Sequence, residues 1–330
     1  MLECKTAFIT GINGQDGSYL TELLLEKGYK VVGLVRRLSV PESQTSRLEE
    51  AGVYPHERLH LEYGDLTDQS SLFRILSKYS PDEIYNLGAQ SHVRVSFDAP
   101  QFTTDTIAIG TLNLLEAVRC CCPESKVYQA GSSEMFGNSI DTDGFQRETT
   151  PMIPVSPYGC AKLYAHNIAG VYRDSYGMFV CGGILFNHES PRRGENFVTN
   201  KIVTGAVKIF RGEMSSLSLG NLEATRDWGH SKDYVRAMWM MLQQESPKDY
   251  VCSTGRSHSV GDVVDYVFSK LGLLPTEQFI TIDPKYFRPQ ELNDLKGDSS
   301  LLRKELEWKP EYTFEMLLDE MVQSKMEHNK

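Results

Sequence analysis

The segment KTAFITGINGQDGSYLTELLLEKG, close to the amino terminus, limits the folds open to this chain more than any other stretch. An apolar run leads into Gly11, Gly14 and Gly17, and a helical pattern follows that ends at Gly28. Glycines at such a junction let the backbone turn tightly and approach a pyrophosphate, whose charge the helix amino terminus favours. We therefore predict a dinucleotide-binding turn between a first strand and a first helix.

Strand and helix patterns continue to alternate through the first half. Short apolar runs recur at KVVGLV, RLHLEYG, DEIYNLG and KVYQAG, and the stretches between them follow the 3.6-residue helical period, as from Ile107 to Val118. Continuous apolar strands between helices indicate a parallel sheet covered on both faces. We predict an α/β, doubly wound, Rossmann-like domain over 1–186. Residues 187–330 should form mostly a smaller substrate-binding lobe, discontinuous, with some segments returning to the first domain.

The charge and cysteine content narrow the function classes. The net charge of −10 over 330 residues argues against nonspecific nucleic-acid binding, and no apolar run approaches the length of a membrane span. The seven cysteines show no regular disulfide spacing. We expect an enzyme of the reducing cytosol that binds neither nucleic acid nor membrane.

One motif points to a metal. HERLH, from His56 to His60, matches the H-E-x-x-H pattern of zinc proteases, which requires a helix. Here the residues that follow alternate as in a strand, where the two histidines would lie roughly 13 Å apart, too far for one zinc. We expect no metal site.

The carboxyl ends of the predicted strands carry the expected cofactor contacts. Two arginines, Arg36 and Arg37, stand where an acid would accept hydrogen bonds from a ribose 2′-hydroxyl, so a 2′-phosphate and hence NADP is favoured over NAD. The alternative is a solvated pair of surface arginines. The remaining contacts are expected from the first turn and from the ends of the third and fourth strands: Ile12, Asn13, Gln15, Asp16, Asp65, Leu66, Leu87, Gly88, Ala89, Gln90 and Ser91.

The reacting groups are expected in two motifs. In SPYGCAKLYA, Ser156 caps a helix that brings Tyr158 and Lys162 onto one face. A lysine one turn away should lower the pKa of the phenol, which could then take a proton from a sugar hydroxyl. In QAGSSEMFG, Ser132 and Glu134 follow a strand end. Glu134 either acts as an acid–base group or is a loop carboxylate that caps a helix or faces water.

Longer strings carry a resemblance to a known family. The chain resembles the extended short-chain dehydrogenase/reductases and, within them, the GDP-mannose 4,6-dehydratases. The matching strings, which run nearly end to end, are GINGQDGSYL, YGDLTD, IYNLGAQSHV, SPYGCAKLYA, GILFNHESPRRGENFVT, LGNLEATRDWGHSKDYV and YFRPQE. NHESPRRG and RDWGH are much more diagnostic of that family than the glycines.

The resemblance implies a lyase whose active site is Ser132, Glu134, Tyr158 and Lys162. Tyr158 would take the O4 proton of GDP-mannose while hydride leaves C4 for NADP. Glu134 would then remove the C5 proton as the C6 hydroxyl leaves as water, and hydride would return to C6. The implied product is GDP-4-dehydro-6-deoxy-mannose, a precursor of GDP-fucose or other GDP-6-deoxyhexoses.

The resemblance also assigns residues of the second half. His188 and Arg193 would lean toward the cofactor. The expected substrate contacts are Asn187, Val198, Lys201, Arg226, Arg288 and Glu291. The arginines suit a diphosphate, because guanidinium forks match phosphate oxygens, although each could equally form a surface salt bridge. Glu291 would accept hydrogen bonds from a guanine edge or a ribose.

Some positions depart from the family pattern. Ser132 stands where threonine is common, and Phe102 replaces a frequent tyrosine near the cofactor. The segment LSVPESQTSR also differs; in relatives it reaches the cofactor of a neighbouring subunit, and a homodimer or homotetramer is expected. Three alternatives stay open: a reductase or epimerase of a GDP-4-keto-6-deoxy sugar, a UDP- or dTDP-hexose dehydratase, and a non-catalytic NADP-binding sensor.

Overall fold

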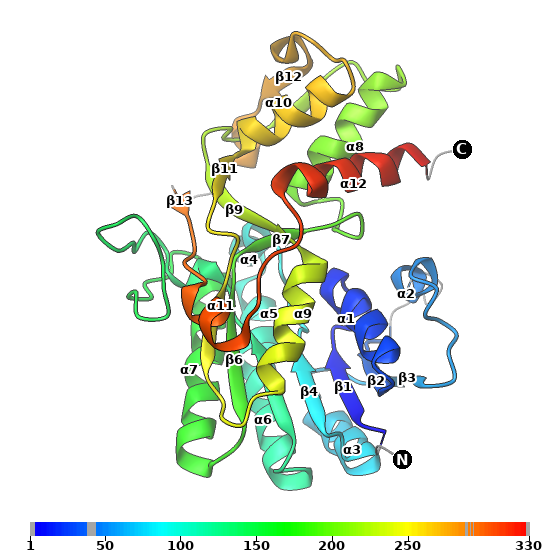
Figure 1. Cartoon of the computed structure of the whole chain (residues 1–330), viewed down its shortest axis with the longest axis vertical. Coiled ribbons are helices and arrows are strands. Elements are labelled where there is room, and N and C mark those ends of the chain that lie inside the picture. The colour runs from blue at the N-terminus through cyan, green and yellow to red at the C-terminus, as the bar shows by residue number, and fades with distance from the viewer. Residues whose placement is uncertain (1–3, 38–43, 288–289, 291, 293, 328–330) are drawn as a thin grey trace.

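A seven-stranded parallel sheet forms the centre of the computed structural model, which describes residues 4–37, 44–287, 290, 292 and 294–327 (Figure 1). In spatial order its strands are β10 (Asp249–Cys252), β6 (Val180–Leu185), β5 (Lys126–Ala130), β4 (Glu83–Asn86), β1 (Thr6–Thr10), β2 (Lys30–Val35) and β3 (Leu59–Tyr63). Strand order reverses beside β1, where ligands bind in doubly wound sheets. The predicted fold class is confirmed.

Helices cover both faces of this sheet, because its strands are apolar on both sides. In β1, Ala7 and Ile9 pack toward one face, and Phe8 packs toward the other. The first face is covered by α1 (Gln15–Glu26) and α9 (Ser231–Leu242); the second by α3 (Gln69–Tyr79), α6 (Gly110–Cys121) and α7 (Pro157–Tyr176). Because all seven strands are parallel, their carboxyl ends lie at one edge of the sheet.

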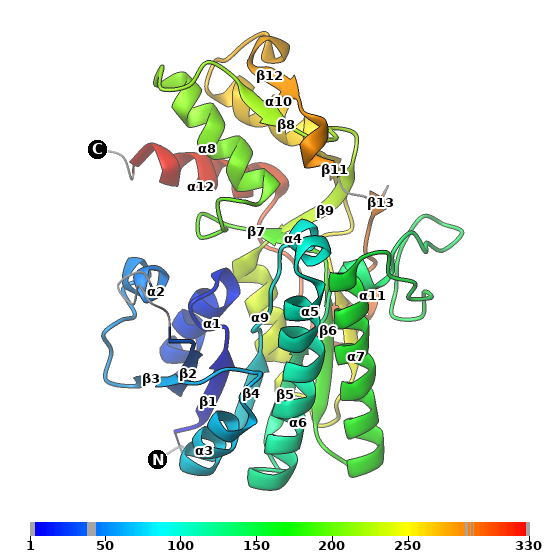
Figure 2. The ribbon, with the colours of Figure 1, turned by 180° about the vertical axis from the view of Figure 1, so that it is seen from behind.

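A second group of elements lies over that edge (Figure 2). Strand β9 (Thr225–His230) is its centre and pairs with β7 (Asn187–Glu189), β11 (Ser257–Ser259) and β13 (Asp294–Leu295). Helices α8 (Val198–Phe210), α10 (Val260–Lys270) and α12 (Phe314–Glu327) pack together in a separate apolar core, and β8 (Leu217–Leu219) pairs with β12 (Ile280–Ile282). The short helices are α2 (Ser46–Glu50), α4 (Val93–Asp98), α5 (Pro100–Thr104) and α11 (Ser300–Leu306).

The chain crosses between the two groups several times after residue 187. It leaves the large sheet at β7, returns as α9 and β10, leaves again, and returns as α11, which packs against β10. Within the described residues, no helix is both long and apolar enough to cross a membrane.

The helical stretch expected from Ile107 to Val118 differs in its first part. Residues Asp105–Ile109 form a π-helical turn between α5 and α6, and α6 begins only at Gly110. A Cβ atom on Gly110 would lie 2.8 Å from the Leu66 Cβ atom, so the junction packs directly against the loop after β3. The 3.6-residue period cannot detect this turn, because the apolar spacing of α6 itself is regular.

Candidate active site

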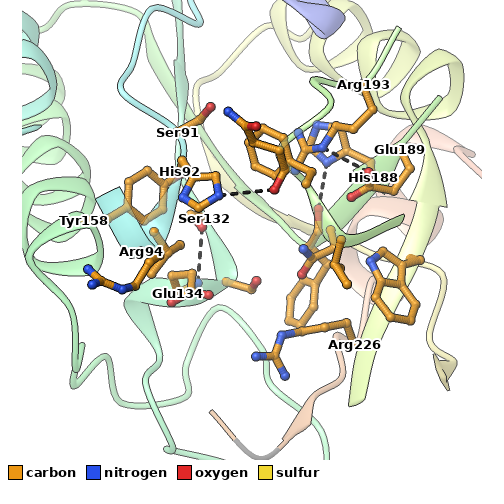
Figure 3. Close-up of a pocket in the computed structure, with 18 of the residues that line it drawn as sticks. Ser91, His92, Arg94, Ser132, Glu134, Tyr158, His188, Glu189, Arg193 and Arg226 are labelled. Atoms are coloured by element: carbon orange, nitrogen blue, oxygen red, sulfur yellow. Dashed lines mark hydrogen bonds and ion pairs between the residues drawn. The ribbon is translucent and has the colours of Figure 1, made fainter. Parts of the chain in front are cut away.

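A cavity of about 350 Å³ opens between the carboxyl ends of the sheet strands and the β7–β9 pair (Figure 3). Ser132, Glu134 and Tyr158 line one wall, and His188, Glu189 and Arg193 lie across from them. The predicted residues that line this cavity are Asp16, Leu87, Ala89, Ser91, Ser132, Glu134, Tyr158, Lys162, Asn187, His188, Arg193, Val198, Lys201 and Arg226. The structure thus brings together residues that are up to 210 positions apart in the sequence.

A short turn after β5 positions the first two reacting groups. Ser132 caps the 3₁₀ turn Ser133–Met135, and its hydroxyl accepts a hydrogen bond of 3.2 Å from the Glu134 amide. Both side chains are nearly buried, at 9% and 8% exposure. Glu134 is therefore not a solvent-facing loop carboxylate; it lies inside the cavity beside Ser132.

Helix α7 positions the other two. It begins at Pro157, and the Ser156 side chain caps it by accepting a hydrogen bond from the Gly159 amide at 3.0 Å, as predicted. Tyr158 and Lys162 lie one turn apart on its buried face. The Lys162 Nζ atom donates to the Ala130 carbonyl oxygen at 2.8 Å and lies 5.9 Å from the centroid of the Tyr158 ring. The lysine is thus fastened to the end of β5.

Burial is the largest influence on the pKa values of Tyr158 and Lys162 in the protein without bound ligand. It raises the pKa of Tyr158 to about 12; the hydrogen bond with Ser132 opposes this rise, and the Glu134 charge adds to it. Burial also lowers the pKa of Lys162 to about 8, although the Asp16 charge favours its protonated form. The net direction of the Tyr158 pKa is therefore upward, because desolvation penalises the phenolate and Ser132 is the group that opposes it most; a lowering contribution from Lys162 stays a prediction.

The glycine turn has the close contacts of a dinucleotide-binding turn. Gly11 has a φ of +69°, and a Cβ atom there would lie 2.9 Å from the Gly88 amide nitrogen. At Gly17, a Cβ atom would lie 2.3 Å from the Gly11 carbonyl oxygen. No side chain caps α1, whose N-cap is Gly14. The bare helix amino terminus fits an anionic pyrophosphate.

A second cavity of about 260 Å³ lies beside the first and shares its wall of Ala89, Ser91, His92, Asn196 and Phe197. Three predicted cofactor residues, Arg36, Gln90 and Phe102, line only this second cavity. Arg36 and Phe102 are therefore brought together.

The remaining predicted cofactor residues line neither cavity: Gly11, Ile12, Asn13, Gly14, Gln15, Gly17, Arg37, Asp65, Leu66 and Gly88. The Arg37 guanidinium lies 5.8 Å from the centroid of the Tyr63 ring. The Asp65 carboxylate accepts hydrogen bonds from Thr67, and Leu66 is buried in the core.

The expected substrate contacts come from the second group of elements, which lies over the carboxyl edge of the sheet. Lys201 Nζ donates to the Ser218 carbonyl at 2.7 Å, and Arg226 donates to the Leu292 carbonyl at 3.0 Å, which fixes both cations at the cavity wall. The predictions for Arg288 and Glu291 lie outside the described residues. Among the described residues, no group of three or more histidine, cysteine, aspartate or glutamate side chains could hold a metal ion, and His60 of the HERLH motif lies in β3.

Known proteins match this chain over nearly all of its length. The family model described as GDP-mannose 4,6 dehydratase matches residues 8–321. A GDP-mannose 4,6-dehydratase of Vibrio cholerae is 49% identical, covering 98% of this chain and 94% of the relative. GDP-mannose 4,6 dehydratase 1 of Arabidopsis thaliana is 52% identical over 98% and 90%, and the Homo sapiens protein is 47% identical over 98% and 92%.

The chain belongs to the GDP-mannose 4,6-dehydratase family. Solved structures agree in fold. A dTDP-glucose 4,6-dehydratase of Bacillus anthracis in complex with NAD has a TM-score of 0.85 at 24% identity, covering 98% of this chain and 97% of that one. The RMD protein of Pseudomonas aeruginosa, complexed with NADPH, has a TM-score of 0.79 at 20% identity, covering 97% and 99%.

Sequence reasoning missed several residues of this family member's cavity. His92, Val93 and Arg94 line it from α4 and its cap, next to the predicted stretch that ends at Ser91. Lys285 and Tyr286 line it from the 3₁₀ turn Pro284–Tyr286, shortly before Arg288. Each group directly adjoins a predicted segment, so extending those segments by a few residues would have found them. The other missed residues include Leu219, Gly220 and Asn221.

Proposed function

We propose that this protein is an NADP-dependent GDP-mannose 4,6-dehydratase, which converts GDP-α-D-mannose to GDP-4-dehydro-6-deoxy-α-D-mannose and water. The family membership supports the reaction class. The observation that carries the proposal is the position of Glu134, a buried carboxylate in the same cavity as Ser132, Tyr158 and Lys162. A reductase or epimerase of the same fold needs no such group beside the C5 and C6 atoms of a sugar.

The residues present fit a nicotinamide dinucleotide. The Gly11–Gly17 turn would hold the pyrophosphate against the bare end of α1, and Arg36 would face a 2′-phosphate from the second cavity. When bound, the nicotinamide supplies a hydride acceptor for C4 and a hydride donor for C6. The choice of NADP over NAD rests on Arg36, whose guanidinium matches a phosphate better than a ribose hydroxyl.

Tyr158 is the group that takes the O4 proton of the sugar. Its hydroxyl is buried in the cavity, and Ser132 stabilises the phenolate by a hydrogen bond. The Lys162 Nζ atom is held on the Ala130 carbonyl, and Lys162 lies on the same buried face of α7 as Tyr158. Loss of the O4 proton and of the hydride on C4 leaves a ketone at C4, which acidifies the hydrogen at C5.

Glu134 takes this C5 proton and returns a proton to the departing C6 hydroxyl, which leaves as water. Its backbone is fixed in the 3₁₀ turn, because its amide donates to the Ser132 hydroxyl, and its side chain lines the cavity. Because the hydride taken from C4 returns to C6, the sugar nucleotide undergoes no net oxidation. The arrangement thus serves an internal redox elimination.

Substrate binding is proposed for the cavity wall that β7, α8 and β9 form. Lys201 and Arg226 supply cations for the diphosphate inside a chain whose net charge is −10. Asn187 and Val198 lie on the same wall and would contact the sugar. Arg288 and Glu291 remain proposed contacts of the nucleotide by family resemblance alone.

Self-association as a homodimer or homotetramer, and a cytosolic location, are also proposed. Self-association is supported by exposed apolar side chains on three segments that pack against one another, α5, the π-helical turn and α7. These side chains are Phe102, Ile109, Tyr164 and Val171. All seven cysteines are free, which supports a reducing compartment.

The proposal is tested by incubating the purified protein with NADP and, separately, GDP-mannose, UDP-glucose and dTDP-glucose. We expect loss of one water from GDP-mannose by mass spectrometry, with no accumulation of NADPH. Preference for UDP- or dTDP-glucose would reassign the substrate and leave the reaction class. Stoichiometric NADPH release would indicate a dehydrogenase. A reductase would instead consume NADPH in a parallel incubation with a GDP-4-keto-6-deoxy sugar, and binding without turnover in any incubation would indicate a sensor.

A further inference from the structure

Asp16 places a carboxylate where an anionic cofactor should bind. It is the second residue of α1, in the first turn of a helix whose amino terminus no side chain caps. A helix amino terminus attracts anions, so a carboxylate there competes with a diphosphate and repels it. The repulsion has to be neutralised if the turn is to hold a dinucleotide.

His188 supplies the neutralising charge. Its Nε2 atom lies 2.8 Å from the Asp16 Oδ2 atom, and its Nδ1 atom lies 2.7 Å from the Phe186 carbonyl oxygen. A carbonyl and an ionised carboxylate only accept hydrogen bonds, so both ring nitrogens must carry a proton. With Asp16 ionised, the geometry thus corresponds to an imidazolium paired with a carboxylate.

The surroundings of the ring agree with this charge state. Burial opposes the charged form of His188, but the Asp16 carboxylate outweighs it and raises the His188 pKa, while Arg193 acts in the opposite sense. Burial likewise opposes ionisation of Asp16, yet His188 lowers the pKa of that carboxyl, with help from Arg193. From α9, Tyr234 stacks on the ring at 4.4 Å between centroids, and burial raises its pKa well above 10, so it is neutral.

The charge of Asp16 also reaches across the cavity to α7. It favours the protonated form of Lys162 and raises the pKa of Tyr158. The titratable and charged groups that interact with the pair are therefore Arg193, Lys162, Tyr128, Tyr158 and Tyr234. Asp16 is the anion that contacts His188 directly, so the protonation of the ring depends chiefly on Asp16.

The neighbouring residue strengthens the same connection. Gln15 donates from Nε2 to the His188 carbonyl oxygen at 3.1 Å and accepts from the Ser190 hydroxyl at 2.8 Å. Two consecutive residues of α1 thus hold β7, which pairs with β9, the strand that carries the cavity-lining Arg226 and Trp228. The cofactor turn and the substrate wall are joined at this point.

We propose that Asp16 is a positioning residue, which orients His188, keeps that ring positively charged beside the cavity and, with Gln15, fastens β7 to the cofactor turn. The inference rests on the proposed function, since it assumes an anionic dinucleotide at α1. In the wild type the pair is net neutral around neutral pH, so it adds no pH dependence to cofactor affinity.

The variant Asp16→Asn makes the charge of the ring depend on pH. The Asn amide can donate to Nε2 of a neutral ring while Nδ1–H stays on the Phe186 carbonyl, so the packing is kept. Without its carboxylate partner, His188 should titrate below the ordinary value of 6.5 because burial then dominates. At acid pH the unpaired imidazolium attracts the cofactor. The affinity of the variant relative to wild type should rise on the order of tenfold as the pH falls through that titration.

Two measurements test this. NMR follows the His188 resonance, assigned with His188→Gln, in wild type and Asp16→Asn, and calorimetry gives the NADP dissociation constant at several pH values. The control is Glu22→Gln, which breaks the 2.8 Å ion pair of Glu22 with Arg192 between the same helix and the same segment without touching His188. We expect wild-type titration and pH profile in the control. An unchanged His188 titration in Asp16→Asn, or equal weakening by both variants at every pH, would overturn the proposal.

A charge cycle keeps the inference testable if Asp16→Asn folds poorly. His188→Gln leaves the Asp16 carboxylate unpaired and should weaken NADP binding about tenfold at neutral pH, whereas Asp16→Asn combined with His188→Gln should recover most of that loss. A double variant as weak as His188→Gln alone would contradict the charge argument. Failure of the proposed function would instead appear as absent turnover of GDP-mannose, with the His188 titration unaffected.

Discussion

The Lys162 Nζ atom donates to the Ala130 carbonyl oxygen at 2.8 Å, so the lysine ties helix α7 to the end of strand β5. The contact lies 5.9 Å from the centroid of the Tyr158 ring, and both side chains are nearly buried. A carbonyl is a weak partner for a buried ammonium. The lysine is therefore held in place at a cost to its charged form.

This cost predicts a pH dependence of stability. Burial lowers the folded-state pKa of Lys162 to about 8 from 10.5, so between these values the unfolded chain binds more protons and stability rises with pH. Relative to Lys162→Met, the wild type should gain up to about 3 kcal/mol of unfolding free energy from pH 8 to pH 10.5. Urea unfolding of both proteins measures this; a constant difference over that window would show that Lys162 does not titrate there.

Ser132 should control how readily Tyr158 ionises. Its hydrogen bond opposes the burial that raises the phenol's pKa to about 12. In Ser132→Ala that opposition is lost, so C4 oxidation should slow roughly 10²-fold and its pH–rate profile should shift to higher pH. Ser132→Thr keeps the hydroxyl and should retain the wild-type profile. A uniform rate loss in Ser132→Ala without a shift would assign the serine to positioning Glu134 alone.

Glu134→Gln separates dehydration from oxidation. The amide keeps the size of the side chain but cannot take the C5 proton, so we expect about 10²–10⁴-fold less 6-deoxy product with normal binding of NADP and GDP-mannose. Oxidation at C4 should survive in part. In deuterated water the variant should not exchange the C5 hydrogen, which mass spectrometry detects. Near-wild-type dehydration would mean that another residue is the base.

Arg36 and Arg37 should contribute unequally to the choice of cofactor. Arg36 lines the second cavity, whereas Arg37 lies over the Tyr63 ring. Arg36→Ala should therefore weaken NADP about tenfold or more and leave NAD nearly unchanged, while Arg37→Ala should have a smaller effect. Calorimetric titration with both dinucleotides makes the comparison. Equal affinity of the wild type for NADP and NAD would remove the basis of this assignment.

The local parts of the fold and of the site follow from sequence patterns. Gly11, Gly14 and Gly17 predicted the turn before α1, and Ser156 with Pro157 predicted the start of α7, because caps and glycines act through neighbouring backbone atoms. The four-residue spacing of Tyr158 and Lys162 placed both on one helix face. These features need no knowledge of what lies elsewhere in the chain.

Only the tertiary structure decided which side chains meet and what burial does to them. Asp16 and His188 are 172 residues apart, and nothing local indicates that their side chains form an ion pair. The spacing of Tyr158 and Lys162 gave their proximity but not the net direction of the phenol's pKa, because desolvation depends on every segment that excludes water from the cavity. The sequence determined the elements through short-range backbone geometry; the charge states depended on long-range packing.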